Sequence, residues 1–356
     1  MIAILTSGPG LGAHVPGLLL SRRLAERGVR SRVDVFEASW PEERRERIAA
    51  SKQAYQRDFR YARLGQRLFR NLSEAFDPAA VDGLLREWRA HGVTRLVVLG
   101  GFWLPVADRY AAGSEGRVEV DVCHMDSVRS PSFARQRESP AHREIWLFDA
   151  ANAAIPWTIP PSDSLPLPWS ARRDRFVAHG GGWCMGTYRE YAGELAALGT
   201  SLDVVVPALE DSTGGAPGTR FFMMDPAWSP WRDGGFPPFG EIVGGEPPEY
   251  ARHERHHGSL TLVREARAVI SKPGGGTLLD AFHCATPVVF LESFGEHEEH
   301  NASLWTHLGF GITFEDWRAT GFAQEPLAEM HRRMLRRHAE PRDYPLDLAT
   351  RARLRA

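Results

Sequence analysis

Short apolar runs alternate with stretches of helical pattern along the whole chain. In the first half, these runs predict strands at residues 2–5, 31–36, 95–101, 118–122 and 145–149. In the second half, they predict strands at residues 175–178, 202–206, 268–270 and 287–291. Because helical patterns fill the gaps, each half should form a parallel sheet with helices on both faces. The pattern therefore predicts an α/β protein of two Rossmann-like domains that face a central cleft.

A proline-rich stretch marks the expected boundary between the two halves. Five prolines fall within residues 156–168, a density typical of a linker between domains. We expect a first domain at residues 1–165, a second at 170–325 and a helical tail at 326–356.

Three segments between the predicted elements have a distinctive composition. Residues 41–72 look helical and carry nine basic against four acidic side chains. This helix could meet an anionic acceptor or membrane headgroups, but a solvated Arg-rich face is the favoured interpretation. Residues 207–250 are rich in Gly, Pro and Trp and predict irregular structure that could cover a cleft. Residues 292–300 predict an acidic loop before a helix at 301–308.

Overall composition narrows the possible partners. The 356 residues carry a formal net charge of −2, which does not favour a nucleic-acid partner. No apolar stretch is long enough to span a bilayer, so we expect a soluble, cytoplasmic protein without stable membrane insertion. The three cysteines lack metal-binding or disulfide spacing. Nothing in the sequence predicts an oligomeric state.

Glycine loops follow predicted strands at residues 8–12, 180–182 and 274–276. The last follows an apolar strand and precedes a helix expected to begin near Thr277, so its backbone N–H groups and the helix dipole would favour a phosphate. A plain tight turn is the alternative. The first loop lacks the dinucleotide spacing, and neither a P-loop nor an Asp-x-Asp motif occurs. We therefore expect no metal and no cofactor.

Titratable residues near these loops are candidates for catalysis. His14 ends the first loop and could take a proton from an acceptor, although a structural histidine is as common there. Asp126 follows a strand and could orient His14 or act as a base, but a capping aspartate is commoner. Glu298 and Glu299 precede a predicted helix, where the dipole favours carboxylates, and could also hold sugar hydroxyls. A metal site here is the weakest interpretation.

These motifs together resemble glycosyltransferases of the two-domain B fold (GT-B), and within them family 28, which includes the N-acetylglucosaminyltransferase of lipid II synthesis. Residues 12–17 (GAHVPG) are similar to that family's G-G-H-x-x-P-G turn, with one residue fewer between His and Pro. Residues 123–127 (CHMDS) resemble its H-E-Q-N loop, with Met125 and Asp126 in place of Glu and Gln. Residues 268–302 resemble its nucleotide-sugar half, and the Lys-Pro-Gly-Gly within them is also similar to diacylglycerol glycosyltransferases.

The resemblance implies that the two halves of the chain bind different substrates. Residues 1–165 would bind the acceptor, with His14 near the acceptor or the donor phosphate, and residues 170–325 would bind a UDP-sugar donor. Together with the chemistry argued above, this makes His14 and Asp126 the expected catalytic residues. The glycines and Thr277 would face the pyrophosphate, Asp280 the ribose, and the Glu298-Glu299 pair, which replaces a Gln pair, the donor sugar. The implied donor-binding residues are Gly12, Gly181, Gly182, Lys272, Gly274, Gly275, Gly276, Thr277, Asp280, Glu298, Glu299 and Asn301.

A narrower similarity is to cytosylglucuronate synthases, which would imply transfer of glucuronate from UDP to cytosine, with Lys272 facing the sugar carboxylate. The sequence thus predicts a metal-independent, inverting glycosyltransferase that uses a UDP-sugar and a small acceptor. A UDP-sugar 2-epimerase, a lipid-acceptor glycosyltransferase and a non-catalytic nucleotide-sugar-binding protein are the alternatives.

Overall fold

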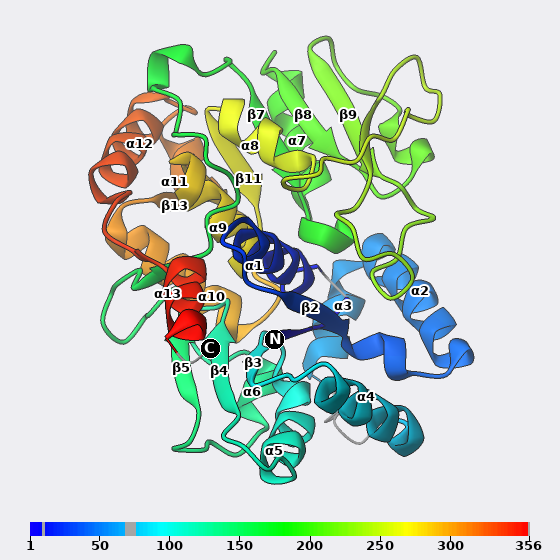
Figure 1. Cartoon of the computed structure of the whole chain (residues 1–356). Helices are drawn as coiled ribbons and strands as arrows, with labels where there is room; N and C mark the ends of the chain where they lie inside the picture. The colour runs from blue at the N-terminus through cyan, green and yellow to red at the C-terminus, as the bar shows by residue number, and fades with distance from the viewer. Residues whose placement is uncertain (9–10, 68–75, 355–356) are drawn as a thin grey trace.

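The computed structural model describes residues 1–8, 11–67 and 76–354, and within them it forms two separate main sheets (Figure 1). One sheet belongs to the first half of the chain and the other to the second half. Apart from β10, each strand pairs in parallel with its neighbours, as the alternation of strands and helices predicted. The predicted α/β class with two Rossmann-like domains is confirmed. The domain boundaries remain predictions.

The first sheet has the strand order β2-β1-β3-β4-β5. Its strands are β1 (Ile2–Thr6), β2 (Ser31–Val35), β3 (Arg95–Val98), β4 (Glu119–His124) and β5 (Arg143–Trp146). Its connections contain α1 (His14–Glu26), α2 (Glu42–Arg57), α3 (Phe59–Arg67), α4 (Pro78–Ala90), α5 (Leu104–Ala112) and α6 (Pro131–Ala134). β1 is buried along its whole length, as its unbroken apolar run requires.

The second sheet has the order β10-β9-β8-β7-β11-β12-β13. Its strands are β7 (Phe176–His179), β8 (Leu202–Val205), β9 (Thr219–Met224), β10 (Phe239–Ile242), β11 (Ala268–Ser271), β12 (Val288–Phe290) and β13 (Gly311–Thr313). The helices that accompany it are α7 (Tyr188–Ala197), α8 (Ser259–Glu265), α9 (Gly275–Cys284), α10 (Glu296–Leu308), α11 (Phe314–Ala319) and α12 (Glu325–Arg337).

The C-terminal segment returns to the first half of the molecule. β14 (Arg342–Asp343) pairs in parallel with β6 (Trp157–Thr158), and α13 (Tyr344–Arg353) packs against α1. In Figure 1, α13 is the red helix beside β4 and β5. Tyr344 is fully buried and donates a hydrogen bond from its hydroxyl to Asp121 Oδ2, 2.9 Å away. The end of the chain is therefore part of the packing around the first sheet.

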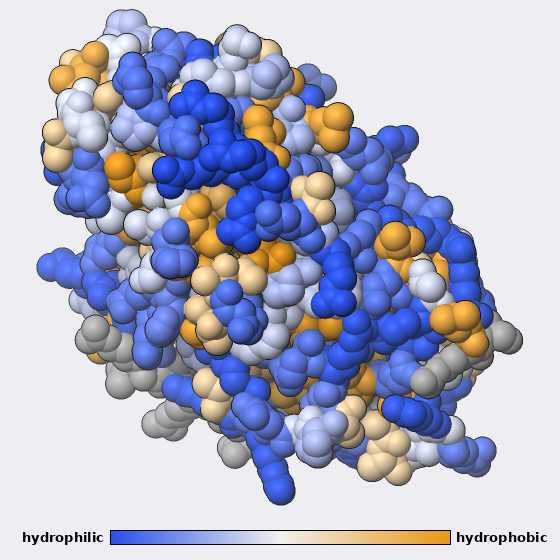
Figure 2. All heavy atoms as spheres, turned by 90° about the vertical axis from the view of Figure 1, so that its left-hand side faces the viewer, coloured by the Kyte–Doolittle hydropathy of each residue, from blue (hydrophilic) through white to orange (hydrophobic). Residues whose placement is uncertain are grey.

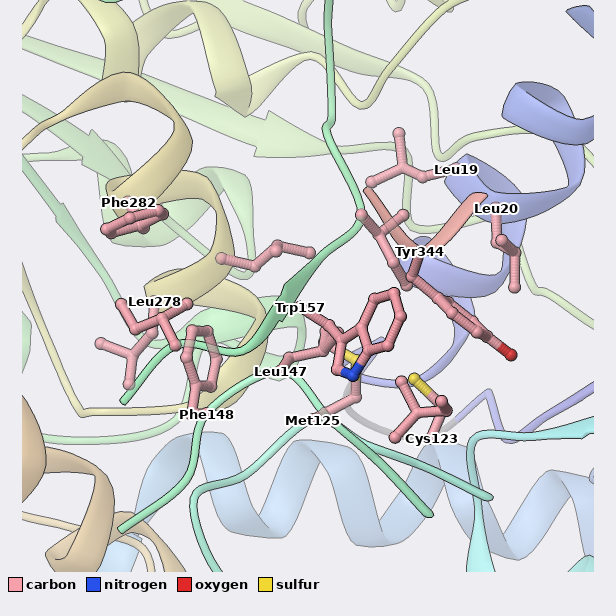
Figure 3. Close-up of a cluster of buried hydrophobic side chains, with 14 of the residues drawn as sticks. Leu19, Leu20, Cys123, Met125, Leu147, Phe148, Trp157, Leu278, Phe282 and Tyr344 are labelled. Atoms are coloured by element: carbon pink, nitrogen blue, oxygen red, sulfur yellow. The ribbon is translucent and has the colours of Figure 1, made fainter. Parts of the chain in front are cut away.

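One hydrophobic core crosses from the first half to the second. It joins Leu19 of α1 and Met125 after β4 to Leu278 and Phe282 of α9. Figure 3 shows these side chains with Tyr344 of the C-terminal segment. Because protein interiors are close-packed, this shared core fixes α9 relative to the first sheet.

The structure differs from the sequence prediction in three segments. The predicted helix over 41–72 is interrupted at Asp58, between α2 and α3, and its last residues lie outside the described part of the chain. The region 207–250, predicted to be irregular, contains β9 and β10. Phe222 and Met223 of β9 are buried, but glycines and prolines nearby in the sequence obscured the strand pattern. The prediction of an acidic loop over residues 292–300 is wrong beyond residue 295, because α10 begins at Glu296. The dipole of this helix favours the acidic residues in its first turn.

Hydrophilic side chains predominate on the face shown in Figure 2, where apolar ones gather only in small groups. None of the helices in the described residues combines the length and the apolar character that a membrane crossing requires.

Candidate functional site

A cavity of about 380 Å³ opens between the two halves of the molecule. Residues 11–13 and 125–126 line it from the first half. Residues 179–185, 257–259 and 274–277 line it from the second half. Several of these segments directly follow parallel strands, so the carboxyl ends of strands from both sheets face the same space, where open α/β sheets bind their ligands.

The third glycine loop, residues 274–276, lines this cavity. β11 ends at Ser271 and α9 begins at Gly275, two residues before the start expected near Thr277. The N–H groups at the start of a helix have no partner within it, and no acceptor is recorded among the described residues for those of Gly275, Gly276 or Thr277. These donors and the positive end of the helix dipole make the loop suited to an anion.

The first and third glycine loops meet across the cavity. A Cβ atom at Gly276 would lie 3.8 Å from the Cα atom of Gly12. A Cβ atom at Gly275 would lie only 2.1 Å from the carbonyl oxygen of Met125, so no larger residue fits there without a shift. Glycine is thus required at Gly275 by close approach of the two halves.

Lys272 brings a positive charge to the cavity, but this charge already has a partner. Its Nζ forms an ion pair with Glu298 Oε1, and the backbone N–H of Phe294 donates to Glu298 Oε2 at 2.7 Å. Glu298 is only 2% exposed, so its carboxylate is held in place on both oxygens. An incoming diphosphate would compete with Glu298 for Lys272.

Asp280 lies deeper in α9 and pairs with a histidine from another segment. Its carboxylate is 2.9 Å from His257 Nε2, and His257 Nδ1 lies 2.8 Å from Ser259 Oγ. Burial disfavours the charged imidazole, but the Asp280 carboxylate outweighs burial and raises the pKa of His257. His179, which also lines the cavity, has its pKa lowered to about 4 by burial.

His14 lies beside the cavity and not in its lining. The side chain is fully buried, with Nδ1 3.1 Å from Thr6 Oγ1 and with Nε2 unpaired among the described residues. The Trp228 ring lies next to it in a tilted arrangement, with a distance of 6.0 Å between the ring centroids. Burial lowers the pKa of His14 to about 4, so the imidazole is neutral at physiological pH and able to accept a proton.

Asp126 and Asn301 form a contact between the halves. Asn301 Nδ2 donates to Asp126 Oδ1 and to the carbonyl oxygen of Pro273, both at 2.9 Å. Asn301 Oδ1 accepts a hydrogen bond of 2.7 Å from the backbone N–H of Ser127. This buried amide is thus satisfied on both sides and ties the loop after β4 to the third glycine loop.

No protein-family model matches the chain, and no curated protein matches it. Solved glycosyltransferase structures, in contrast, align with almost its whole length. VinC in complex with DTDP covers 100% of both chains, with a TM-score of 0.60 and 11% identity. SsfS6 of Streptomyces sp. SF2575, complexed with thymidine diphosphate, covers 100% of this chain and 99% of its own, with a TM-score of 0.59 and 13% identity. MurG of Acinetobacter baumannii covers 98% of both chains, with a TM-score of 0.51 and 13% identity.

The chain has the GT-B fold. At these identities the likeness establishes the fold alone, and it confirms the architecture that the motifs predicted.

Within the GT-B fold, most of the predicted donor-binding residues lie around one cavity. The predicted residues that line it are Gly12, Asp126, Gly181, Gly182, Lys272, Gly274, Gly275, Gly276, Thr277, Asp280 and Glu298. Glu299 is exposed and lies outside the lining, because it points away from Glu298 on the helical surface of α10. His14 and Asn301 lie next to the cavity, behind its surface. The roles of all these residues remain predictions.

The structure also adds residues to the site. His257 pairs with Asp280, and Phe239 and Met224 contribute apolar lining from β10 and β9. The sequence signal for His257 was the cluster of three histidines at residues 253–257, and His179 directly precedes the second glycine loop. Among the described residues, no group of three or more His, Cys, Asp or Glu is arranged to hold a metal ion.

Proposed function

We propose that this protein is a glycosyltransferase that moves a sugar from a nucleoside diphosphate donor to a small acceptor. The observation that carries the proposal is the cavity in which two glycine loops, one from each sheet, meet beside Lys272. The unpaired N–H groups at the start of α9 fit a diphosphate, and the neighbouring His14 fits a proton acceptor. The bound thymidine diphosphate in the SsfS6 structure supports a nucleotide in a GT-B cleft of this kind.

In the proposed reaction, the acceptor shifts Trp228, reaches the buried His14 and gives its proton to Nε2. The acceptor oxygen or nitrogen then bonds to the anomeric carbon of the donor, and the bond from that carbon to the phosphate oxygen breaks. The nucleoside diphosphate leaves with the electron pair, stabilised by the N–H groups of Gly275, Gly276 and Thr277. Attack from the face opposite the leaving group inverts the anomeric carbon. No metal is invoked, because the helix dipole and Lys272 supply the positive charge.

The donor itself is proposed to be a UDP-sugar, and the carboxylate of glucuronate would find a cation in Lys272. The first experiment is incubation of the protein with UDP- and dTDP-sugars, UDP-glucuronate included, and a panel of acceptors that contains cytosine. Mass spectrometry should detect a conjugate in equal amount to the released nucleoside diphosphate, and NMR should show the inverted anomer. An isomerised donor without acceptor would indicate a 2-epimerase, and nucleotide binding without any turnover would indicate a binding protein. Either result would contradict the proposal.

Two substitutions test the Lys272–Glu298 pair by calorimetry. Lys272→Met should weaken UDP binding at least tenfold, because Lys272 is the only lysine among the described residues that line the cavity. Glu298→Gln should leave UDP binding as tight or tighter, since Lys272 loses its competing partner, but should weaken binding of the UDP-sugar. Glu299→Gln is the matched control, and its exposed side chain should change neither affinity by more than twofold. Equal effects at Glu298 and Glu299 would contradict this assignment.

A further inference from the structure

A second cavity of about 400 Å³ adjoins the first. It lies between α2 of the first half and residues 226–232, which belong to the loop between β9 and β10. Leu11, Gly182, Trp183 and Met224 line both cavities. A molecule in the second cavity would therefore sit next to the donor site proposed above, and holding two reactants side by side favours transfer between them.

The second cavity contains a lysine without a partner. Lys52 reaches it from α2, is partly buried, and forms no recorded hydrogen bond or ion pair with the described residues. Burial lowers the pKa of Lys52, and the nearby Cys184 raises it by a smaller amount. A partly buried, unpaired ammonium group is unfavourable on its own and is stabilised by an anion.

The other charged groups of the lining do not compensate Lys52. Arg45 and Arg232 both form ion pairs with the Glu42 carboxylate, so each of these two cations already has an anionic partner. Glu46 also lines the cavity, but it is an exposed residue and has no recorded contact with Lys52. Lys52 is therefore the charge that remains available to a ligand.

The walls of the second cavity are aromatic. Trp183, Trp228 and Trp231 line it together with Pro226 and Pro230. Tryptophan rings offer large, rigid and flat apolar surfaces, which suit a planar ligand ring. Trp228 also packs against His14, so a ligand that shifts this ring would gain access to the imidazole.

We propose that this second cavity binds the acceptor, and that the acceptor is a planar aromatic compound with a carboxylate that pairs with Lys52. The proposal rests on the function proposed above, because an acceptor has meaning only beside a donor. The carboxylate holds one end of the ring at α2, and the opposite end of the ring carries the hydroxyl or amino group that meets the donor.

Equilibrium binding tests the proposal without the transfer reaction. The probes are 4-hydroxybenzoate, 3-hydroxy-2-naphthoate and indole-3-acetate, each paired with its uncharged methyl ester, and cytosine as a planar neutral ring. The three cavity tryptophans report binding through their fluorescence, and calorimetry confirms the affinities. At least one acid should bind at least tenfold more tightly than its ester. Lys52→Gln should remove that preference by weakening the acid and not the ester.

Arg47→Gln is the matched control, because it removes one positive charge from an exposed position of the same helix. It should leave both affinities within twofold of the parent protein. Equal binding of acids and esters, tighter binding of cytosine than of every acid, or an unchanged preference in Lys52→Gln would overturn the proposal, as would no binding of any probe. UDP binding is measured in parallel on the same variants. Its absence from the parent would contradict the proposed function, whereas its retention alongside failed acid binding would contradict only the acceptor assignment.

Discussion

The chemistry of single residues in this site is set by what surrounds them. His14, His179 and His257 are the same side chain in three surroundings. Burial alone lowers the pKa of His14 to about 4, and burial outweighs the charges near His179 with the same result. At His257 the Asp280 carboxylate reverses the direction and raises the pKa. His14 and His179 are therefore both neutral near pH 7, and His14 is the one proposed here to act as a base.

The pH dependence of the transfer rate should reflect the protonation of His14. The active form is the neutral imidazole, so kcat/KM should fall as pH decreases through the pKa of His14. In the parent protein this fall is expected near pH 4, below the ordinary value near 6.5. Trp228→Ala uncovers the ring, and it should move the fall toward pH 6.5 because water again stabilises the charged form.

Two measurements check this prediction. The pH profile of kcat/KM gives the position of the acid limb, and an NMR titration of the histidine rings gives the pKa of His14 directly. His14→Ala identifies the NMR signal and should abolish the limb along with most of the activity. A limb near pH 6.5 in the parent that Trp228→Ala does not move would exclude His14 as the base.

Sequence patterns predicted the glycine loops and the candidates around them, because backbone requirements leave a local trace. Gly275 and Lys272 were found in this way. The contact partners of such residues were not predicted. A contact such as that of Asp280 with His257 joins two segments that no sequence pattern relates. The hydrogen bonds of Asn301 between the two halves were likewise not visible in the sequence, and its predicted role at the donor stays a prediction.

At the scale of elements, the start of α9 is held against the loop after β4. Asn301 of α10 completes this contact, so three elements from both halves meet at one place. Strand and helix order was predictable from periodicity, but β9 and β10 were missed because proline and glycine dominate their surroundings. Each of the helices α9 and α10 has an apolar face and contacts with loops. The apolar face can be predicted from the sequence pattern, whereas the loop contacts cannot.

The fit between α9 and the loop after β4 predicts different costs for two neighbouring glycines. Gly275→Ala should lower the free energy of unfolding by about 1–3 kcal/mol, because its Cβ would meet backbone atoms of Met125 that cannot rotate away. Gly276→Ala should cost nothing, since its Cβ would have only an ordinary contact with Gly12 and alanine favours a helix. Urea unfolding of both variants measures the difference. Equal stability of the two would mean that the halves do not meet as closely as described.

At the scale of the whole molecule, the two halves are joined by more than the proline-rich linker. The chain crosses from the first sheet to the second near residues 147–175 and returns near residues 338–343. β6 and β14, one from each crossing, pair with each other. The two crossings thus form a second connection between the halves beside the shared core.

The return of the chain predicts that α13 stabilises the first half. Leu348→Ala should lower the free energy of unfolding by about 2–5 kcal/mol, because Leu348 is 1% exposed within the shared core. Leu346→Ala, on the same helix but 53% exposed, should change it by less than about 0.5 kcal/mol. Urea unfolding gives both values, and hydrogen exchange should show the loss of protection in β4. Comparable effects at the two leucines would contradict a stabilising role of α13.

The pairing of Tyr344 and Arg351 with Asp121 also has a consequence for biosynthesis. Asp121 is buried in β4, and during translation it emerges more than two hundred residues before its partners. A ribosome-bound chain that ends before residue 344 therefore leaves the Asp121 carboxylate with only its longer ion pair to Arg143, at 3.8 Å, and exposes the apolar surface that α13 later covers. Nascent chains arrested at that point should bind chaperones and resist compaction until the last helix has left the exit tunnel.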